Sequence, residues 1–242
     1  IVINKSLMVN GNGHVIDGAN QARLFNLTTN SIELYNFILV NGYAENGSVI
    51  YSNAAGDKLS SSIVLNSTGS VIYCPFWFAA NENWFGNTID DYDVAPVVEG
   101  DQVELNKWLF LTVDVSKFDL FVGDKAIITL NLTNMYDATR KTNSTFTGII
   151  PVTFELSCVG GDINVSEATL IDGVAELEFI GDGIGPGYLE MSCYNVNEEF
   201  YFNVSCDDDS FTALQKLIDK ANGKVVLQHD YRYYDYDEKY KN

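Results

Sequence analysis

Basic residues are scarce in this chain. Its 242 residues include 14 lysines and arginines against 33 aspartates and glutamates, which gives a formal net charge of −19. A surface this negative repels phosphate backbones, so we do not expect a nucleic-acid partner. Three of the basic residues are arginines, and Arg23, Arg140 and Arg232 lie far apart in the sequence. The composition therefore disfavours a basic cleft for an acidic substrate.

Long apolar runs and catalytic motifs are missing as well. No run of 18 apolar residues occurs, so the sequence predicts no membrane-spanning helix. We expect any signal peptide or anchor to lie outside this chain, which starts at Ile1. We find no nucleophile motif, phosphate-binding loop, zinc-ligand spacing or EF-hand loop. The 46% of hydrophobic residues, together with frequent Gly, Asn and Ser, is typical of a folded, turn-rich β protein.

Two modules and a tail follow from the strand patterns. In residues 1–106 the tetrapeptide SVIY at 48–51 recurs at 70–73, and LFNL at 24–27 precedes them. A second set of short apolar runs, each ending in Asn, lies at 7–10, 32–36 and 63–66. Gly and Asn between the runs suit tight corners, since both reach left-handed backbone angles, and Asn also stacks in hydrogen-bonded ladders. This spacing predicts three to four coils of a parallel β-helix, with an antiparallel sandwich as the alternative.

Aromatic residues gather where this repeat ends, at 75–78 and 83–87, ahead of an acidic stretch from Asp90 to Glu104. We interpret the aromatics as a lid over the apolar end of the last coil, because aromatic rings cover the largest area per residue. A sugar-stacking platform is the alternative. The acidic stretch is predicted to be a linker.

Residues 107–206 predict an immunoglobulin-like β-sandwich. Seven alternating runs lie at 108–115, 125–133, 151–158, 163–170, 173–180, 187–194 and 198–205. The Cys-Trp-Cys spacing of antibody domains is absent. Cys158 and Cys193 both project inward from strands that can face each other across the sandwich. Two alternatives are therefore compatible with the sequence, a Cys158–Cys193 disulfide or two free thiols. A turn between Asn197 and Glu198 would argue against a bridge from Cys193 to Cys206, and Cys74 is expected to be a buried thiol.

Residues 207–242 form a third segment. An amphipathic helix is predicted at 210–222 and a strand at 223–227, followed by an acidic, Tyr-rich end. We interpret this tail as the opening of a β-helix. The segment that would continue it resembles the one that starts at Ile1, so the chain corresponds to about one period of a tandem array. The tail either hangs free or folds back to cap the first coil. We favour the second, because residues 225–227 and 1–3 both need strand neighbours.

Three groups of polar residues are candidate sites. Carboxylates cluster at the module junctions, at Asp90, Asp91 and Asp93, at Asp207, Asp208 and Asp209, and at Asp235 and Asp237, where Ca²⁺ would find hard oxygen ligands. The alternative is a solvated surface, with Asp209 or Ser210 capping the helix. His14 and Asp17 share a Gly-rich turn, but a corner histidine beside a turn aspartate explains them better than a catalytic pair. His229 and Asp230 belong to another segment. We predict no catalytic residue, no cofactor and no metal as part of the function.

Asn-x-Ser/Thr sequons recur throughout the chain and fit an extracellular surface, although an Asn-rich chain generates several by chance. The possible glycosylation sites are Asn4, Asn26, Asn46, Asn66, Asn131, Asn143, Asn164 and Asn203.

Several motifs resemble a known family. The segments NGNGHVIDG at 10–18, NGYA at 41–44, NWFGN at 83–87 and NKWL at 106–109 are similar to signatures of adhesin-like surface proteins of methanogenic archaea. The resemblance implies a right-handed parallel β-helix, here with fewer coils than usual, followed by an immunoglobulin-like repeat. It also implies that residues 211–233 open a further β-helix. It brings no catalytic residues.

We therefore expect an all-β, non-enzymatic, extracellular protein at the cell surface. Its role would be to present a binding face to other cells or to surface glycans and proteins, alongside neighbouring repeats of the same parent chain. A purely structural stalk is the near alternative. A carbohydrate-active β-helix similar to polysaccharide lyases is the distant one, since such enzymes need basic residues or clustered aspartates.

Overall fold

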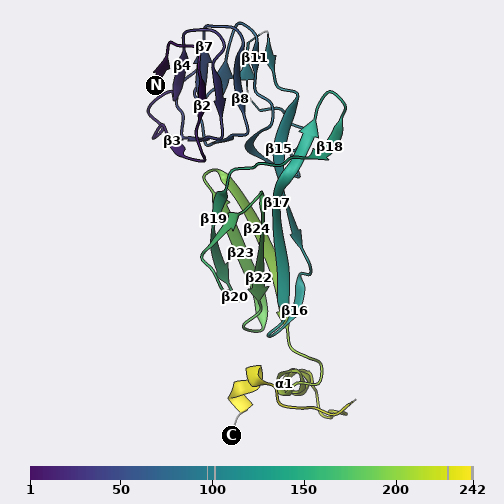
Figure 1. Cartoon of the computed structure of the whole chain (residues 1–242). Helices are drawn as coiled ribbons and strands as arrows, with labels where there is room; N and C mark the ends of the chain where they lie inside the picture. Colours follow the sequence, from purple (N-terminus) through teal and green to yellow (C-terminus); the bar gives the residue numbers. More distant parts are fainter. Residues whose placement is uncertain (97, 101, 228, 241–242) are drawn as a thin grey trace.

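The computed structural model describes residues 1–96, 98–100, 102–227 and 229–240. It is an all-β protein with a single α-helix in the described residues, near the C-terminus. A β-solenoid forms one end of an elongated molecule, a β-sandwich forms the middle, and the helical tail forms the other end (Figure 1). Within the described ranges, no helix combines the length and apolarity needed to cross a membrane.

The solenoid has about four turns and three parallel sheets. The two strand families found in the sequence had suggested two sheets. The first sheet is β1 (Val2–Ile3), β4 (Phe25–Leu27), β7 (Ile50–Ser52), β10 (Ile72–Tyr73) and β13 (Val98–Glu99). The second is β2 (Met8–Asn10), β5 (Glu33–Tyr35), β8 (Asp57–Ser60), β11 (Phe78–Ala79) and β14 (Val103–Glu104). The third begins with β3 (Val15–Asp17), β6 (Ile38–Val40), β9 (Ile63–Leu65), β12 (Asn83–Thr88) and β15 (Lys107–Val115).

The sequence repeats stack as predicted in the first sheet, where Phe25 lies beside Ile50, Ile50 beside Ile72, and Tyr51 beside Tyr73. The second predicted family was partly wrong. Its first two members are β2 and β5, but residues 63–65 are β9 of the third sheet. The acidic stretch from Asp90 to Glu104 is not only a linker, because it contributes β13 and β14 to the solenoid; Asp101 within it lies outside the described residues.

Asparagine holds the corners, as the sequence indicated. Asn36, Asn41 and Asn66 have φ values of 58°, 55° and 50°, in the left-handed region that few residue types tolerate. The Asn41 Nδ2 donates to Asp17 Oδ1 at 2.8 Å, and the Asn66 Nδ2 donates to Asn41 Oδ1 at 2.6 Å. This ladder ties three successive coils together.

Strand β15 belongs to both modules. It pairs in parallel with β12 of the solenoid and antiparallel with β17 (Lys125–Asp137) of the sandwich. The third solenoid sheet therefore continues into the sandwich as one nine-stranded sheet, through β22 (Val174–Ile180) to β20 (Asp162–Ile163), with β18 (Thr142–Thr145) pairing β17. The predicted boundary at 106/107 falls at the start of this shared strand.

The other sandwich sheet has the order β16, β24, β23, β19, β21. Its strands are β16 (Asp119–Phe121), β24 (Val196–Ser205), β23 (Gly185–Cys193), β19 (Val152–Val159) and β21 (Glu167–Leu170). The seven predicted runs all contain strands, and the run at 163–170 is divided between β20 and β21. The short strands β16 and β18 were not predicted. The predicted inward faces of β19, β23 and β24 are correct at Phe154, Met191 and Phe202, which are buried.

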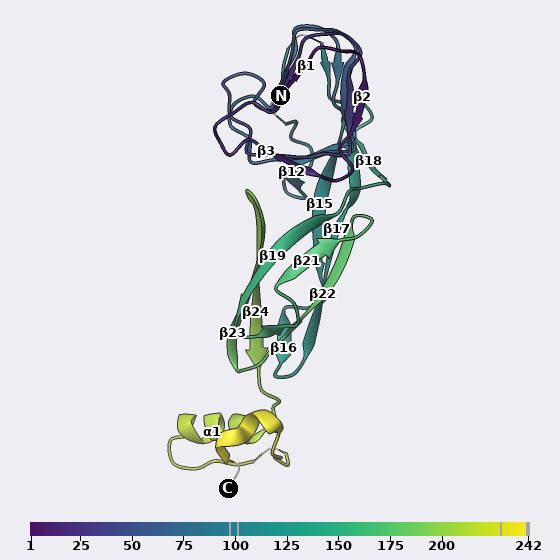
Figure 2. The same ribbon diagram turned by 60° about the vertical axis from the view of Figure 1, so that its left-hand side comes forward.

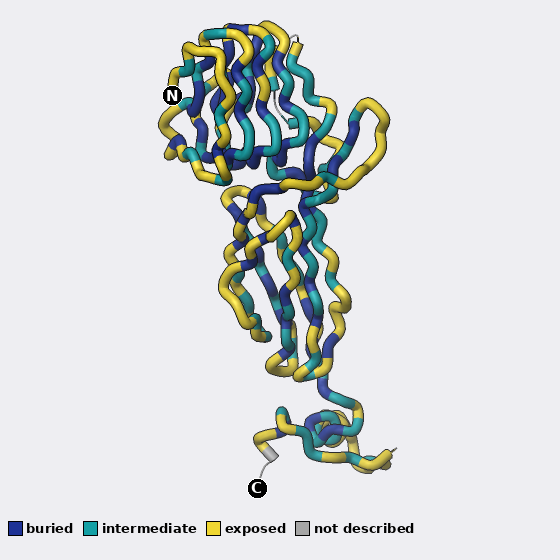
Figure 3. The backbone as a smooth tube through the Cα atoms, in the orientation of Figure 1, coloured by how far each residue is buried: buried dark blue, intermediate teal, exposed yellow. Residues whose placement is uncertain are grey.

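The third solenoid sheet is apolar on both faces. Leu39 and Val64 point into the solenoid core, whereas their neighbours Val40, Ile63 and Leu65 join the core of the sandwich. All five are at most 3% exposed. Figure 3 shows this buried layer where the two modules meet. Since alternating positions are buried on opposite sides, the third sheet separates two cores, and the solenoid side chains that enter the sandwich core fix the solenoid against the sandwich.

The tail folds as a small unit beyond the far end of β24. Helix α1 (Phe211–Lys220) is capped by Ser210, whose side chain accepts from Ala213 N at 3.0 Å, and a 3₁₀ segment η1 (Asp235–Tyr240) packs beside it. The carboxylate of Asp237, fully buried, accepts from the backbone N–H groups of Phe211 and Thr212 at 3.1 and 2.9 Å. The segment 223–227, predicted as a strand, is irregular.

The predicted fold-back of the tail onto the first coil is wrong. The N-terminus lies in the solenoid, and helix α1 lies past the opposite end of the sandwich, in both views (Figures 1 and 2). The reason is the direction of β24, which starts near the solenoid, where Asn195 Oδ1 accepts from Asn66 N at 2.8 Å, and runs away from it.

Candidate functional site

Exposed aromatic residues mark one corner of the solenoid, between the first and second sheets. Phe76 and Trp77 follow β10, and their side chains are 48% and 40% exposed. The Trp77 carbonyl accepts from Gly56 N at 2.9 Å, so the corner is tied to the preceding coil. A tryptophan held by its backbone with an open ring offers a flat apolar surface to a ligand. This corner is our candidate binding face.

A stacked ladder runs along the first sheet beside this corner. The rings of Tyr51 and Tyr73 are 5.0 Å apart and nearly parallel, at 13°. The Arg23 guanidinium lies 4.5 Å from the centre of the Tyr51 ring and is fixed by bonds to the carbonyls of Gly47 and Asn46 at 2.9 and 2.8 Å. The faces of Tyr51 are thus covered on both sides by protein groups. The ladder supports the coil stack, and the open rings are those of Phe76 and Trp77.

The other aromatics of the predicted lid have structural roles. Phe78 is buried in the solenoid interior. Trp84 is fully buried on the sandwich side of β12, where its ring centre lies 6.3 Å from that of Phe154 and its indole N–H donates to Asn87 O at 2.9 Å. These side chains do not lie over an open end of the solenoid, because β13 to β15 follow the last aromatic coil. They fill the interior and the junction.

The motifs at 83–87 and 106–109 meet at this junction. In the β12–β15 register Asn83 lies beside Trp108, and Trp84 lies beside Leu109. Asn83 is fully buried and bonds to the backbone of Leu59 and Ser62, while the Trp108 indole donates to Tyr92 O at 2.8 Å. The motifs therefore join the two modules.

The Asp17 side chain holds a corner of the solenoid. The Asp17 carboxylate accepts from Ala19 N at 2.7 Å and from Asn41 at 2.8 Å, and these bonds lower its pKa. His14 is exposed, and no hydrogen bond joins it to Asp17 among the described residues. His229 lies in the tail, where its Nε2 is 3.0 Å from Asp208 O.

Two carboxylates of the cluster at 207–209 are engaged with protein donors. Asp209 pairs with Arg232 at 2.8 Å and accepts from the Tyr234 hydroxyl at 2.7 Å, and Asp207 accepts from the Tyr236 hydroxyl at 2.6 Å. Burial and the bond to Asp207 raise the pKa of Tyr236 to about 12. In the ranges that the structure covers, no three His, Cys, Asp or Glu side chains are arranged to hold a metal ion. The geometry gives the Ca²⁺ hypothesis no support.

Cys158 and Cys193 are free thiols, and the geometry proposed for their disulfide was wrong. Their strands β19 and β23 are neighbours in one sheet and do not face each other across the sandwich. Cys158 lies beside Leu189, four residues from Cys193, which corresponds to about 13 Å along a strand and exceeds the reach of a disulfide. The β23–β24 hairpin turns at residues 194–195, not at 197–198, so Cys193 lies beside Val196. Cys74 is fully buried, as predicted, and Cys206 is buried and free.

The eight sequon asparagines differ in exposure. Asn26 and Asn131 are half-buried, while the remaining six are exposed: Asn4, Asn46, Asn66, Asn143, Asn164 and Asn203. Glycosylation at these positions stays a prediction.

The sequence pointed to parts of this candidate site. The aromatic run at 75–78 was recognised, but periodicity did not separate its exposed members, Phe76 and Trp77, from buried Phe78. The Tyr51–Tyr73 stack was present in the repeated SVIY motif. Arg23 was missed because its partner Tyr51 lies in the next coil, 28 positions further along the chain.

No protein-family model matches this chain, and no curated protein matches it either. A structural search finds similarity to a crystal structure of domains 4 and 5 of the S-layer protein SbsC, at 15% sequence identity and a TM-score of 0.29. The similarity covers 43% of this chain and 56% of that structure.

Proposed function

We propose that this protein is a non-enzymatic, modular cell-surface protein of the adhesin-like type, which holds a binding face away from the surface that carries it. The observation that supports this proposal is the shared strand β15, with the core that continues across it. Two modules joined by a single sheet form a stiff rod, because bending at the junction would break both backbone pairing and hydrophobic packing. Rigidity of this kind suits display.

The proposed binding face is the aromatic corner at Phe76 and Trp77. Sugar C–H faces pack on indole rings, so a surface glycan on another cell or on a substrate is the partner class that this corner fits best. One exposed corner gives weak binding. Repeated units on one parent chain would turn weak contacts into avidity. The predicted extracellular location, the acidic surface and the exposed sequons agree with this role.

A glycan array and a cell-binding assay test the proposal. We expect saturable binding by the wild-type chain and an affinity at least about tenfold lower for Trp77→Ala, since truncating a central aromatic residue of an interface typically removes that much. Tyr201→Ala is the matched control, because Tyr201 is 65% exposed on the sandwich, away from the corner. Equal loss in both variants would contradict the assignment of the corner.

A purely structural stalk is the second candidate, and the same rigid junction favours it. A stalk predicts no saturable binding to any glycan or cell, with the fold intact. The carbohydrate-active alternative predicts release of oligosaccharides from polyuronates, and we expect none. Finding such release would overturn the non-enzymatic proposal.

A further inference from the structure

Five Asn-Gly pairs occur in the chain, at 10–11, 12–13, 41–42, 46–47 and 222–223. Such a pair can deamidate without an enzyme. The backbone nitrogen of the glycine attacks the side-chain amide carbon of the asparagine and closes a five-membered succinimide, while the side-chain nitrogen takes up the glycine amide proton and leaves as ammonia. Water then opens the ring at either carbonyl and gives an aspartate or an isoaspartate. Glycine favours the reaction because it has no Cβ to hinder ring closure.

Ring closure needs a glycine N–H that can lose its proton and approach the asparagine side chain. A donor that is engaged in a hydrogen bond must first break that bond, and a backbone enclosed by neighbouring atoms must first move. The pairs of this chain differ in both respects.

The four pairs in the solenoid have engaged glycines. Each glycine N–H donates to an oxygen of the following coil: Gly11 to Tyr35 O at 2.8 Å, Gly13 to Asn36 O at 2.8 Å, Gly42 to Ser67 Oγ at 3.3 Å and Gly47 to Ser70 Oγ at 2.9 Å. These bonds join successive coils, so breaking one of them loosens the coil stack.

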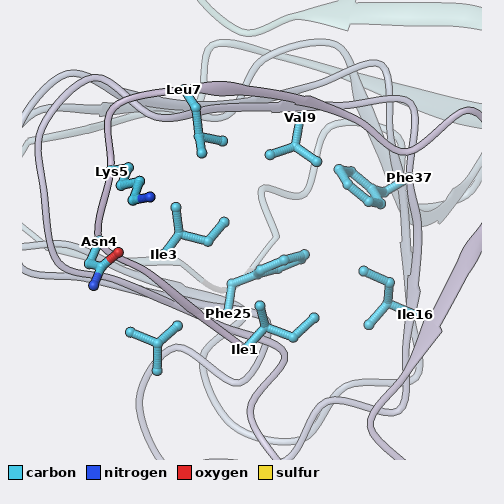
Figure 4. A pocket seen from close by; sticks show the side chains of 10 residues that line it. Ile1, Ile3, Asn4, Lys5, Leu7, Val9, Ile16, Phe25 and Phe37 are labelled. Carbon is cyan, nitrogen blue, oxygen red and sulfur yellow. The ribbon is translucent and has the colours of Figure 1, made fainter.

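Close packing adds to this protection at three of the four pairs. A Cβ on Gly11 would lie 2.4 Å from the Phe37 ring, which lines the interior of the first coil (Figure 4). A Cβ on Gly42 or Gly47 would lie 2.6 or 2.4 Å from a backbone oxygen. Backbone enclosed in this way cannot turn toward the asparagine side chain unless the coil opens.

The pair at 222–223 is open in both respects. It follows helix α1, which ends where Ala221 N donates to Ile218 O at 3.0 Å. Asn222 and Gly223 are exposed, and in the part of the chain that the structure describes no hydrogen bond engages the Gly223 N–H. Apart from the adjoining residues, no described atom lies within 4 Å of the place that a Cβ on Gly223 would occupy. This glycine nitrogen can therefore reach the side chain before it.

We propose that Asn222 is a spontaneous modification site, at which this protein deamidates while its other Asn-Gly pairs stay intact. The products carry a carboxylate, so each modified chain gains one negative charge. That charge lies just beyond Lys220, the last residue of α1, at the negative end of the helix dipole, and it should loosen the last helical turn. The modification follows from the fold and does not depend on the proposed surface role.

Peptide mapping by mass spectrometry tests the site after incubation of the native chain at mildly alkaline pH. The pair at 12–13 is the matched internal control, because Asn12 is also exposed and the nearest atom to a Cβ on Gly13 would be 4.0 Å away. We expect Asn222 to deamidate about tenfold faster than Asn12, because the Gly13 N–H must first break its hydrogen bond. Equal rates at the two positions, or no reaction at Asn222, would overturn the proposal.

Two further measurements identify the cause. In the urea-denatured chain all five pairs should deamidate at similar rates, and a fast reaction at Asn222 alone would show that local sequence and not the fold selects it. Asn222→Gln keeps an exposed amide but cannot close a five-membered ring, so its deamidation should be at least about tenfold slower. The wild-type product should contain isoaspartate. A product with aspartate alone would indicate direct hydrolysis and contradict attack by the glycine nitrogen.

Discussion

Replacing Trp84 tests whether the solenoid and the sandwich form one cooperative unit. Trp84 is a solenoid residue by sequence, yet its fully buried ring belongs to the core of the sandwich and lies near Phe154. Trp84→Ala removes a fully buried tryptophan at the junction together with the indole hydrogen bond to Asn87 O. We expect a loss of about 4 kcal/mol, within the range for large aromatic residues replaced by alanine in a core.

Hydrogen exchange with peptide resolution measures this loss in both modules at once. A loss of about 4 kcal/mol speeds exchange of the most protected amides about a thousandfold. We expect that acceleration equally in β9 of the solenoid and in β23 of the sandwich, because both strands contribute side chains to the core that contains Trp84. Trp77→Ala is the matched control, since it removes an indole that is 40% exposed and should change stability by less than about 0.5 kcal/mol. Acceleration confined to one module would refute the shared core.

Three further changes have defined outcomes. Asn41→Gly should lower the free energy of unfolding by about 1 kcal/mol, because the ladder hydrogen bonds are lost. Asn41→Ala should lower it by about 2 to 3 kcal/mol, because alanine also strains the left-handed backbone. Urea denaturation measures both values, and equal losses would contradict the role of the backbone angle. Asp237→Asn should speed exchange of the Thr212 amide. Burial raises the pKa of Asp237, but hydrogen bonds from Thr212 and the neighbouring amides outweigh it and leave that pKa below its usual value. The stabilisation is therefore complete above about pH 4 and lost as the pH falls through the lowered pKa; a tail whose NMR signals are insensitive to acid would contradict this. Burial raises the pKa of Cys193 to about 11, so about a thousandth of this thiol is ionised at pH 8 and its alkylation in the native protein should be slow. In the denatured chain all four cysteines should be alkylated, and reduction beforehand should not change the mass.

Local patterns in the sequence carried most of the fold. Side-chain alternation located the sandwich strands, and repeated SVIY segments located the first solenoid sheet. The shared sheet escaped prediction because strands of three residues show no clear period. The signal was nevertheless present in Ile63, Val64 and Leu65, since a strand that is apolar at every position is one buried on both faces.

The misplaced disulfide and the misplaced tail had a common origin. Both predictions depended on which strands are neighbours and in which direction they run. Neither property can be predicted from the local pattern of hydrophobic residues. The pairing of β19 with β23 in one sheet separated Cys158 from Cys193, and the hairpin at 194–195 set the direction of β24. Tyr194, the first residue of this hairpin turn, has a φ of 54°, and tyrosine is not a residue type from which a left-handed turn conformation is predicted.

We infer that the solenoid and the sandwich form one rigid rod. Electron–electron resonance between nitroxide labels tests it most directly, with the labels on unnatural amino acids at Asn53 in a solenoid corner and Asp182 in the loop at the far end of the sandwich, both of which are exposed. The shared β15 predicts one narrow distance distribution at all salt concentrations. A broad or two-peaked distribution would show a hinge between the modules and contradict the account.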